Sequence, residues 1–281
     1  MTGELISVIV STYNWPQALD LVLRSLAEQT DRGFEVVVAD DGSGPETREL
    51  VSRHAARFPV RLVHSWQRDE GFRLARSRNL AVTRSRGGYL VFIDGDCVVR
   101  SDFVAAHRRL AHERCVVAGQ RILLSEPFTK HCFETGDIAW KESLPALLRL
   151  RLTGGVNRFA PALSVPFGPV RIMRPVRWQL LRGCNWSLPR ADYFAVGGQD
   201  EAFEGWGYED SDMAVRLVNA GRAVKWGGFT SPCFHLWHKG ANKERAKANY
   251  AELKRVIAQK RVRPKKGCLA VYPEDEAPGG L

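Results

Sequence analysis

The sequence lacks a long apolar run. None of its 281 residues falls in a stretch approaching the ~20 consecutive apolar residues that a membrane-spanning helix needs. Residues 1–4 carry no basic charge, and the apolar stretch after them is too short for a signal peptide. These two absences lead us to expect a cytoplasmic protein.

The sequence also lacks paired cysteines. Its six cysteines are widely separated, and none forms a Cys-x-x-Cys pair. They are Cys97, Cys115, Cys132, Cys184, Cys233 and Cys268. This spacing argues against a zinc knuckle and favours free thiols in a reducing compartment.

Two glycine-rich phosphate-binding motifs are missing as well. The sequence contains neither Gly-x-Gly-x-x-Gly nor a Walker Gly-Lys-Ser/Thr loop. If this protein binds a nucleotide, it therefore has to hold the phosphates with a metal ion and arginine side chains.

The sequence has fewer acidic residues than basic ones. The chain has 41 Lys and Arg against 31 Asp and Glu, a net charge of +10. Such a balance suits a polyanion: nucleic acid, an anionic membrane or a phosphorylated substrate. The strongest basic cluster follows residue 238, so we predict a basic helical tail at 239–281 that contacts anionic membrane.

The first half of the chain alternates apolar strands with amphipathic helices, a pattern typical of a parallel, Rossmann-like α/β sheet flanked by helices. Strands are predicted at 5–12, 34–39, 60–64 and 89–94, with helices at 16–29, 45–57, 71–84 and 102–113. We expect one domain over 1–238, whose first half (1–119) binds a nucleotide-sugar and whose second half (120–238) binds the acceptor.

The pattern weakens in the second half. We expect residues 125–181 to form a connecting segment packed on the sheet, with an apolar and basic helix at 144–152. A contact of that helix with the acceptor or with a membrane surface is the alternative. A helix from 211 to 220 and a strand at 223–229 follow.

Two predicted strands end on acidic residues, at the sheet edge where α/β proteins bind ligands. Asp94 and Asp96 flank Gly95, and two carboxylates so spaced can share a divalent cation that holds a diphosphate. An Asp-Gly turn is the alternative. Of Asp40 and Asp41, one is expected to cap the turn and the other to meet a base or ribose.

A third acidic pair, Glu209 and Asp210, follows two glycines and two aromatic residues. Glycines allow close approach of the backbone, flat aromatic faces stack on sugar rings, and a neighbouring carboxylate can deprotonate a hydroxyl. Further on, either His235 or His238 could complete a metal site.

Together these motifs resemble the family 2 glycosyltransferases with a GT-A fold, in particular their galactosyltransferase-like and chondroitin-polymerase-like members. The matching segments, which appear in family order, are residues 7–14, Asp40-Asp41-Gly42-Ser43, Asp94-Gly95-Asp96 and Gly205-Trp206-Gly207-Tyr208-Glu209-Asp210.

The resemblance implies roles for individual residues. The nucleotide would be bound by Ser11, Tyr13, Asp41 and Asp94, with Arg73 and Arg78 as candidates from the segment over it. The metal would be bound by Asp94, Asp96 (its principal ligand), His235 and His238. Asp210 would be the catalytic base, and the acceptor would be held by Trp206, Gly207, Tyr208 and Glu209.

The function implied is an inverting glycosyltransferase, dependent on Mn²⁺ or Mg²⁺, that moves a sugar from a UDP-sugar to a hydroxyl of a glycan or glycolipid. Relatives of this type extend bacterial lipopolysaccharide core or capsule chains at the inner membrane face. One alternative is a nucleotidyltransferase acting on sugar phosphates, which would need a glycine-rich loop where Tyr13-Asn14-Trp15-Pro16 stands. The other is a basic nucleic-acid-binding protein, although we expect no nucleic acid partner.

Overall fold

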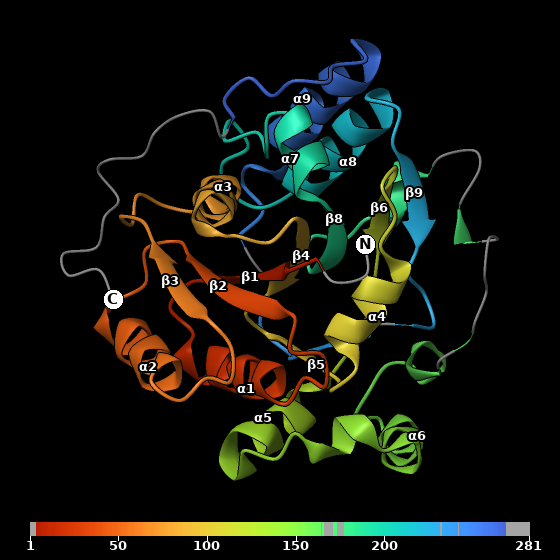
Figure 1. The fold of residues 1–281 in the computed structure, drawn as a ribbon. Helices are drawn as coiled ribbons and strands as arrows, with labels where there is room; N and C mark the ends of the chain where they lie inside the picture. Colours follow the sequence, from red (N-terminus) through yellow and green to blue (C-terminus); the bar gives the residue numbers. More distant parts are fainter. Residues whose placement is uncertain are drawn as a thin grey trace.

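The computed structural model describes residues 4–163, 165, 171–172, 177–230, 232–240 and 242–267. Its centre is a seven-stranded sheet (Figure 1). In spatial order the strands are β3 (Leu62–Trp66), β2 (Phe34–Asp40), β1 (Ile6–Thr12), β4 (Tyr89–Asp94), β8 (Asn185–Pro189), β6 (Cys115–Ala118) and β9 (Ala223–Trp226). Strands β1 to β4 are parallel, and β8 runs antiparallel to both β4 and β6.

Helices cover both faces of this sheet, so the strands are buried on both sides (Figure 1). Alternate residues of β1 point to opposite cores: Val8 and Val10 pack with α1, and Ile9 packs with α3 and α8. One face carries α1 (Pro16–Ala27), α2 (Pro45–Ala55) and α4 (Phe103–Leu110); the other carries α3 (Leu74–Arg84), α7 (Arg190–Ala195) and α8 (Glu209–Asn219). The predicted α/β architecture is confirmed.

The register of the parallel strands aligns their carboxyl ends. Ser11 of β1 pairs with Ala39 of β2 on one side and with Asp94 of β4 on the other. The acidic residues after β2 and β4 therefore meet the end of β1 at one edge of the sheet.

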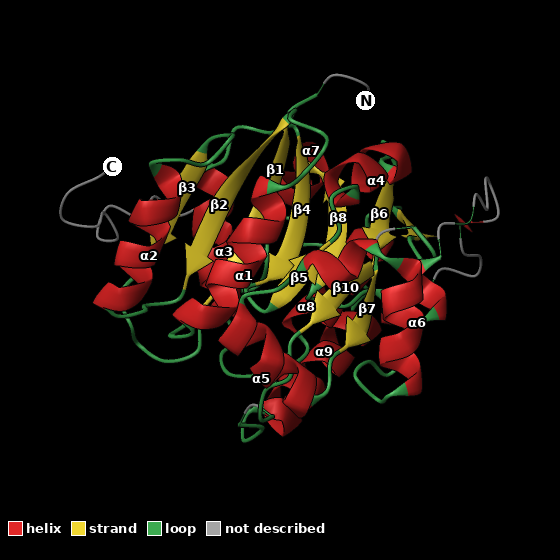
Figure 2. Cartoon of the chain, turned by 90° about the horizontal axis from the view of Figure 1, so that it is seen from below, coloured by secondary structure: helices red, strands yellow, loops and turns green. Residues whose placement is uncertain are grey.

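A second sheet, absent from the sequence prediction, lies beside this edge (Figure 2). It consists of β5 (Cys97–Val99), β10 (Pro232–His235) and β7 (Gln120–Leu123), with β10 in the middle. Strand β10 runs antiparallel to β5, so His235 stands opposite Cys97, one residue after Asp96. These strands have three or four residues each, too few for a periodic signal.

Several predicted bounds were wrong. The strand placed at 60–64 lies at Leu62–Trp66, where β2 supplies its pairing partners. Helix α3 begins at Leu74 rather than 71, because Gly71 has a left-handed φ of 86°. Helix α4 ends at Leu110, and β9 ends at Trp226 because its partner β6 ends at Ala118.

The connecting segment contains more helix than predicted. Helix α5 (Glu126–Thr135) begins at Ser125, whose side chain accepts a hydrogen bond from the Phe128 N–H. The predicted helix at 144–152 is confirmed as α6 (Leu144–Leu152). Residues 164, 166–170 and 173–176 of this segment lie outside the described residues. None of the helices in the described ranges has the length and apolarity needed to cross a bilayer.

The described part of the C-terminal tail packs on the domain. Helix α9 (Ala246–Ala258) contributes Leu253 and Val256 to a small core shared with Val215 of α8. Glu252 binds several of the basic groups, with contacts of 3.1 Å to Arg255, 2.9 Å to Arg261 and 2.8 Å to Lys265. Part of the tail's positive charge is thus neutralised, while the prediction for 268–281 lies outside the described residues.

Candidate active site

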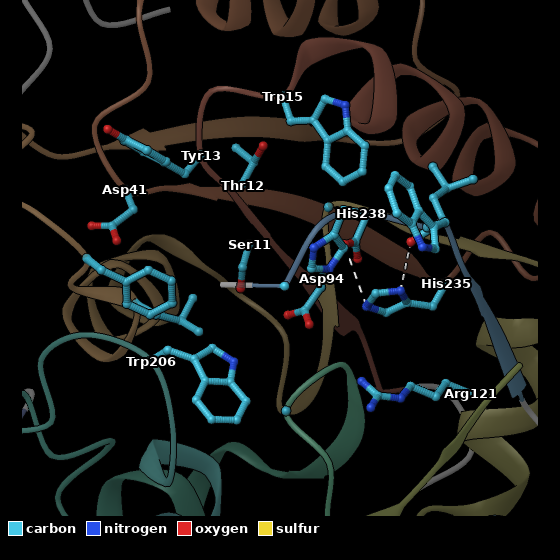
Figure 3. Close-up of a pocket in the computed structure, with 18 of the residues that line it drawn as sticks. Ser11, Thr12, Tyr13, Trp15, Asp41, Asp94, Arg121, Trp206, His235 and His238 are labelled. Carbon is cyan, nitrogen blue, oxygen red and sulfur yellow. Dashed lines mark hydrogen bonds and ion pairs between the residues drawn. The ribbon is translucent and has the colours of Figure 1, made fainter. Parts of the chain in front are cut away.

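A cavity of about 640 Å³ opens at the edge where β1, β2 and β4 end (Figure 3). Ten of the predicted site residues line it: Ser11, Tyr13, Asp41, Arg78, Asp94, Asp96, Trp206, Glu209, His235 and His238. Four others, Arg73, Gly207, Tyr208 and Asp210, stand behind this lining or beside it. The sequence motifs therefore converge on one cavity from six separate segments of the chain.

The two aspartates at the end of β4 are separated by a glycine that has no room for a side chain. The Gly95 N–H donates to the Ser11 carbonyl oxygen at 2.6 Å. A Cβ at Gly95 would lie only 2.6 Å from that same oxygen. The close crossing of Gly95 over β1 turns Asp94 and Asp96 toward the cavity, where both line it.

Both candidate histidines face Asp96. Nε2 of His238 lies 3.4 Å and Nε2 of His235 3.6 Å from Oδ2 of Asp96. The two Nδ1 atoms lie 2.9 Å and 2.8 Å from the backbone carbonyls of Leu236 and Lys239. An Nδ1–H that donates to a carbonyl leaves the neutral ring with its lone pair on Nε2, directed at Asp96.

This arrangement fits a divalent cation. A carboxylate oxygen and two imidazole nitrogens face one another at 3.4 Å and 3.6 Å, and these are ligand types that bind divalent cations. Oxygen and imidazole ligands suit Mn²⁺, and oxygen ligands suit Mg²⁺. The sequence left His235 and His238 as alternatives, whereas the structure brings both to the same carboxylate.

Asp40 and Asp41 occupy different environments, and one of them orders the turn as predicted. Asp40 is fully buried; it accepts from the Ser43 N–H at 2.7 Å and contacts Nε2 of His64 at 2.8 Å. Asp41 lines the cavity instead, held by the side chain of Gln67 and by the Arg73 N–H. Burial raises the pKa of Asp41 to about 6. Asp40 therefore orders the turn, whereas Asp41 lines the cavity.

The two candidate arginines differ in position. Arg78 is fully buried beneath the cavity and donates to Asp94 at 2.8 Å, to Ser11 Oγ at 2.9 Å and to the Gly183 carbonyl at 2.9 Å. Its Nη1 has no hydrogen-bond partner within the described residues. The Arg73 guanidinium binds Glu70 at 2.5 Å. Desolvation raises the pKa of Asp94 to about 6, and Arg78 opposes that rise.

The acidic pair that opens α8 presents two different environments. Glu209 lines the cavity, and its buried Oε2 has no hydrogen-bond partner among the described atoms. Burial, together with the charge of Asp210, raises the pKa of Glu209 to about 7. Asp210 accepts from the Gly183 N–H at 2.8 Å and from the Ser211 N–H at 2.6 Å. These two hydrogen bonds fix the orientation of the Asp210 carboxylate.

The turn before α8 adopts left-handed backbone conformations that favour glycine, and α9 of the tail is hydrogen-bonded to it. Gly205, Gly207 and Tyr208 have φ values of 72°, 107° and 73°, all left-handed. Asn249 of α9 donates to the carbonyls of Glu204 at 3.1 Å and Gly207 at 3.0 Å. The turn exposes Trp206 on the cavity wall, while the Tyr208 ring lies 5.2 Å from that of Tyr250.

Some cavity residues had no signal in the sequence. Arg121 of β7 lines the cavity, and Trp237 does so between the two histidines. Behind them, Cys97, Cys184 and Cys233 are free and buried, with sulfur atoms within 4.8 Å of one another. Residues so far apart along the chain meet through the second sheet, which spacing alone does not predict.

Comparison with known proteins agrees with this geometry. The model of the glycosyl transferase family 2 matches residues 7–162, and the model of the N-terminal domain of galactosyltransferase matches residues 171–239. These two matches cover the sheet edge, both acidic strand ends and the turn before α8. They favour a glycosyltransferase over the nucleotidyltransferase alternative.

Curated relatives support the same assignment. A validoxylamine A glucosyltransferase of Streptomyces hygroscopicus subsp. jinggangensis is 32% identical, over 76% of this chain and 51% of its own length. A chondroitin synthase of Escherichia coli is 26% identical, over 77% of this chain and 32% of its own. The chain thus spans about half of the first relative and a third of the second.

Solved structures share the fold. The Staphylococcus aureus TarS 1-349 structure in complex with UDP superposes with a TM-score of 0.61 and 18% identity, covering 91% of this chain and 64% of that one. A mannosyltransferase of Pyrobaculum calidifontis in complex with GDP-Man and Mn²⁺ gives a TM-score of 0.58 and 19% identity, covering 92% and 68%. The fold is therefore GT-A, and the chain belongs to glycosyl transferase family 2.

Proposed function

We propose that this protein is an inverting, metal-dependent glycosyltransferase that transfers a sugar from a UDP-sugar to a hydroxyl of a glycan or glycolipid. The observation that carries the proposal is the convergence of Asp96, His235 and His238 beside the nucleotide-binding edge of the sheet. The UDP complex of TarS supports the choice of nucleotide. The chondroitin synthase relative supports a glycan acceptor.

The donor nucleotide would lie between β1 and α3. Ser11, Tyr13 and Asp41 offer polar groups to the base and ribose, and Asp94 stands between them and the metal site. Arg78 holds Ser11 and Asp94 in place and keeps one N–H pair free for a phosphate.

Asp96, His235 and His238 would hold Mn²⁺ or Mg²⁺, with Asp94 nearby. The Mn²⁺ complex of the mannosyltransferase supports a divalent cation. Such a cation would neutralise the negative charge that develops on the departing diphosphate. The Nε2 atoms of the two imidazoles, which both face Asp96, would give this chain its own means of binding the cation.

At the acceptor side, Asp210 would accept the proton of the attacking hydroxyl, and Glu209 would hold that hydroxyl. Two backbone N–H groups hold Asp210 in position, as a general base requires. Glu209 can donate or accept near neutral pH, since its pKa is raised to about 7. Trp206 offers a face for the sugar ring. A single displacement of this kind inverts the anomeric centre.

The same proposal places the protein in the cytoplasm, acting at the inner face of a bacterial membrane on lipopolysaccharide core, capsule or a related polysaccharide. Residues 1–238 would form the catalytic domain, with 120–238 on the acceptor side and 239–281 as the tail that contacts anionic lipid.

The proposal is tested with UDP-sugars presented one at a time, with and without Mn²⁺, following release of UDP. Metal-dependent hydrolysis of one donor is expected. With an acceptor identified, Asp210→Asn is expected to bind donor normally and stop transfer, whereas Glu209→Gln is expected mainly to raise the KM for the acceptor. Full transfer by Asp210→Asn would refute its assignment as the base, and hydrolysis unaffected by chelation would refute the metal site.

A further inference from the structure

Exposed apolar side chains of the described residues fall into three groups. Ten large ones are exposed, and four of these, Tyr13, Phe72, Trp206 and Trp237, line the cavity. Two more lie on α9. The remaining four, Leu144, Leu148, Leu152 and Leu163, lie on and just after α6, where the proposed transfer reaction gives them no role.

The leucines of α6 form a continuous stripe. Leu144, Leu148 and Leu152 are spaced at i, i+4 and i+8, so they lie along one side of the helix. Their exposed fractions are 39%, 45% and 79%. A stripe of this kind is not the scatter of single apolar residues found on ordinary surfaces.

The opposite side of α6 is also apolar and already has its partner. Leu147 is 1% exposed, and Leu150 packs against the main core. Apart from two arginines, every residue of the helix is Leu, Pro or Ala. A helix that is apolar all round belongs in an environment that buries all of it. The core buries only one side of α6, so the leucine stripe remains an exposed apolar surface without a binding partner among the described residues.

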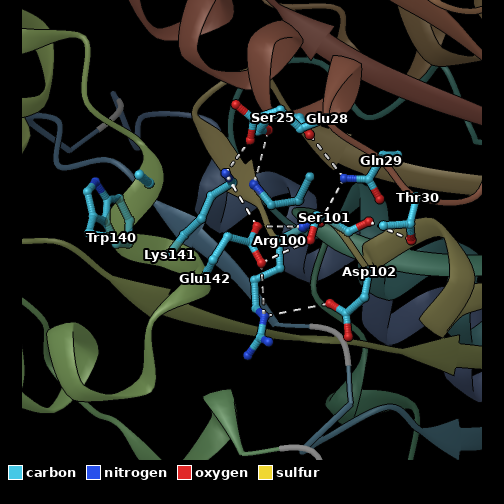
Figure 4. A network of polar contacts seen from close by, with 12 residues as sticks. Ser25, Glu28, Gln29, Thr30, Arg100, Ser101, Asp102, Trp140, Lys141 and Glu142 are labelled. Carbon is cyan, nitrogen blue, oxygen red and sulfur yellow. Dashed lines mark hydrogen bonds and ion pairs between the residues drawn. The ribbon is translucent and has the colours of Figure 1, made fainter.

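The turn before α6 is tied to the main domain by polar contacts (Figure 4). The preceding turn contains the fully buried Lys141, whose Nζ contacts the carboxylate of Glu28, the residue after α1, at 2.6 Å. Next to it, Glu142 accepts from the Ser101 N–H at 2.7 Å. The Ser143 side chain then accepts from the Ala146 N–H in the first turn of α6. The stripe is therefore presented on a fixed support.

The charged residues of α6 and of the loop after it are all basic. Residues 143–163 contain Arg149, Arg151 and Arg158 and no aspartate or glutamate. All three arginines are exposed. A second copy of this chain, with its net charge of +10, would be repelled, whereas an anionic lipid surface attracts arginines and accepts leucines between its headgroups.

We infer that α6 is a membrane-docking helix, whose leucine stripe inserts among the headgroups of an anionic bilayer while Arg149, Arg151 and Arg158 bind lipid phosphates. This surface is separate from the basic tail: Figure 1 shows α6 and α9 on opposite sides of the molecule.

The docking helix is coupled to the cavity through β7. In the loop after α6, the Asn157 N–H donates to the Leu123 carbonyl, the Leu123 N–H donates to Oδ1 of Asn157, and Val156 forms an antiparallel bridge with Leu124. Leu123 and Leu124 line the cavity. A bilayer under α6 would thus lie beside the cavity wall, where a lipid-carried acceptor could enter. This last step rests on the proposed function; the binding of lipid does not.

Co-sedimentation of the whole chain with vesicles, without donor or metal, tests the inference. We expect binding to equimolar phosphatidylcholine and phosphatidylglycerol, and binding to phosphatidylcholine alone weaker by about fivefold for each arginine engaged. Leu152→Glu should weaken binding to the anionic vesicles at least about tenfold. Ala55→Glu, which adds the same charge at an exposed position of α2, should leave it unaltered. Ile257→Glu makes the matching change on α9 of the basic tail.

Leu148→Glu provides a second variant, and thermal melting shows whether each variant is folded. Release of UDP from the donor should be unchanged in Leu152→Glu, so a failure of docking is distinguishable from a failure of the proposed transfer. The inference is overturned if Leu152→Glu binds as the wild type does, or if Ile257→Glu alone loses binding. It is also overturned if α6 proves to join two copies, with Leu152→Glu converting a dimer to a monomer and vesicles left unbound.

Discussion

Nη2 of the buried Arg78 lies 2.8 Å from Oδ1 of Asp94, and this one contact ties α3 to the strand end that carries the candidate metal site. The arginine is fully buried, whereas the Asp94 side chain is 32% exposed on the cavity. The Arg78 guanidinium is therefore part of the buried framework of the site, while the Asp94 carboxylate remains accessible to a ligand.

Replacing Arg78 by glutamine should weaken both the fold and the nucleotide site. We expect the free energy of unfolding to fall by about 2 kcal/mol, less than a fully enclosed ion pair would lose, because Asp94 can still reach water. Affinity for UDP should fall about 10–100-fold, as expected for loss of hydrogen bonds to charged groups. Urea unfolding and calorimetric titration measure the two effects. Arg53→Gln, at an exposed position of α2, should change neither.

Removing the metal ligands should abolish cation binding. Asp96→Asn, His235→Ala and His238→Ala are each expected to lower the affinity for Mn²⁺ at least about a hundredfold, measured in the presence of UDP. His131→Ala, which removes an exposed imidazole from α5, is the matched control. If one histidine variant bound Mn²⁺ as the wild type does, that imidazole would not be a ligand.

Stability should fall as Glu209 ionises. Its pKa is raised from 4.5 to about 7, so the native state holds the proton more tightly than the unfolded chain does. The free energy of unfolding therefore decreases as pH rises through the window between these two values. Glu209→Gln removes that dependence and should be more stable than the wild type above the window, by about 2 kcal/mol. Urea unfolding across the window measures it, and equal pH slopes in both proteins would contradict it.

Weakening the contact between α9 and the turn before α8 should impair acceptor binding more than donor binding. Asn249→Ala removes both hydrogen bonds that α9 makes to the carbonyls of Glu204 and Gly207. We expect a higher KM for the acceptor with little change in metal-dependent donor hydrolysis, and a stability loss of about 1–3 kcal/mol from the unpaired carbonyls. Asn242→Ala, which alters only an exposed contact with the Glu244 N–H, is the control.

The sequence was informative where a motif and a periodic element coincide. Apolar strands ending on Asp40-Asp41 and on Asp94 predicted the binding edge of the sheet, because parallel strands must end together. The sequence was less informative about which of two neighbouring groups faces the cavity. Arg73 and Arg78 are both near α3, but only Arg78 lies on the helix side that meets Asp94.

What the sequence could not predict depends on pairing between distant segments. The second sheet joins residues 97–99 to 232–235 through strands too short to show alternation. The assignment of both histidines to Asp96, the place of Arg121 and the meeting of three cysteines all follow from that pairing. The exposure of the α6 leucines could not be predicted either, because its composition alone is equally consistent with a buried helix.

Because β10 is the middle strand of the second sheet, the candidate cation site forms only when this late segment of the chain is in place. Asp96 comes from the β5 side, whereas both imidazoles arrive with β10, which must insert between β5 and β7. Asp96 and His235 are 139 residues apart in the sequence, so these two ligands meet only when β10 pairs with β5. A cation bound there would therefore fasten the last strand to the first half of the domain, so that affinity for the ion and completion of the fold are a single equilibrium.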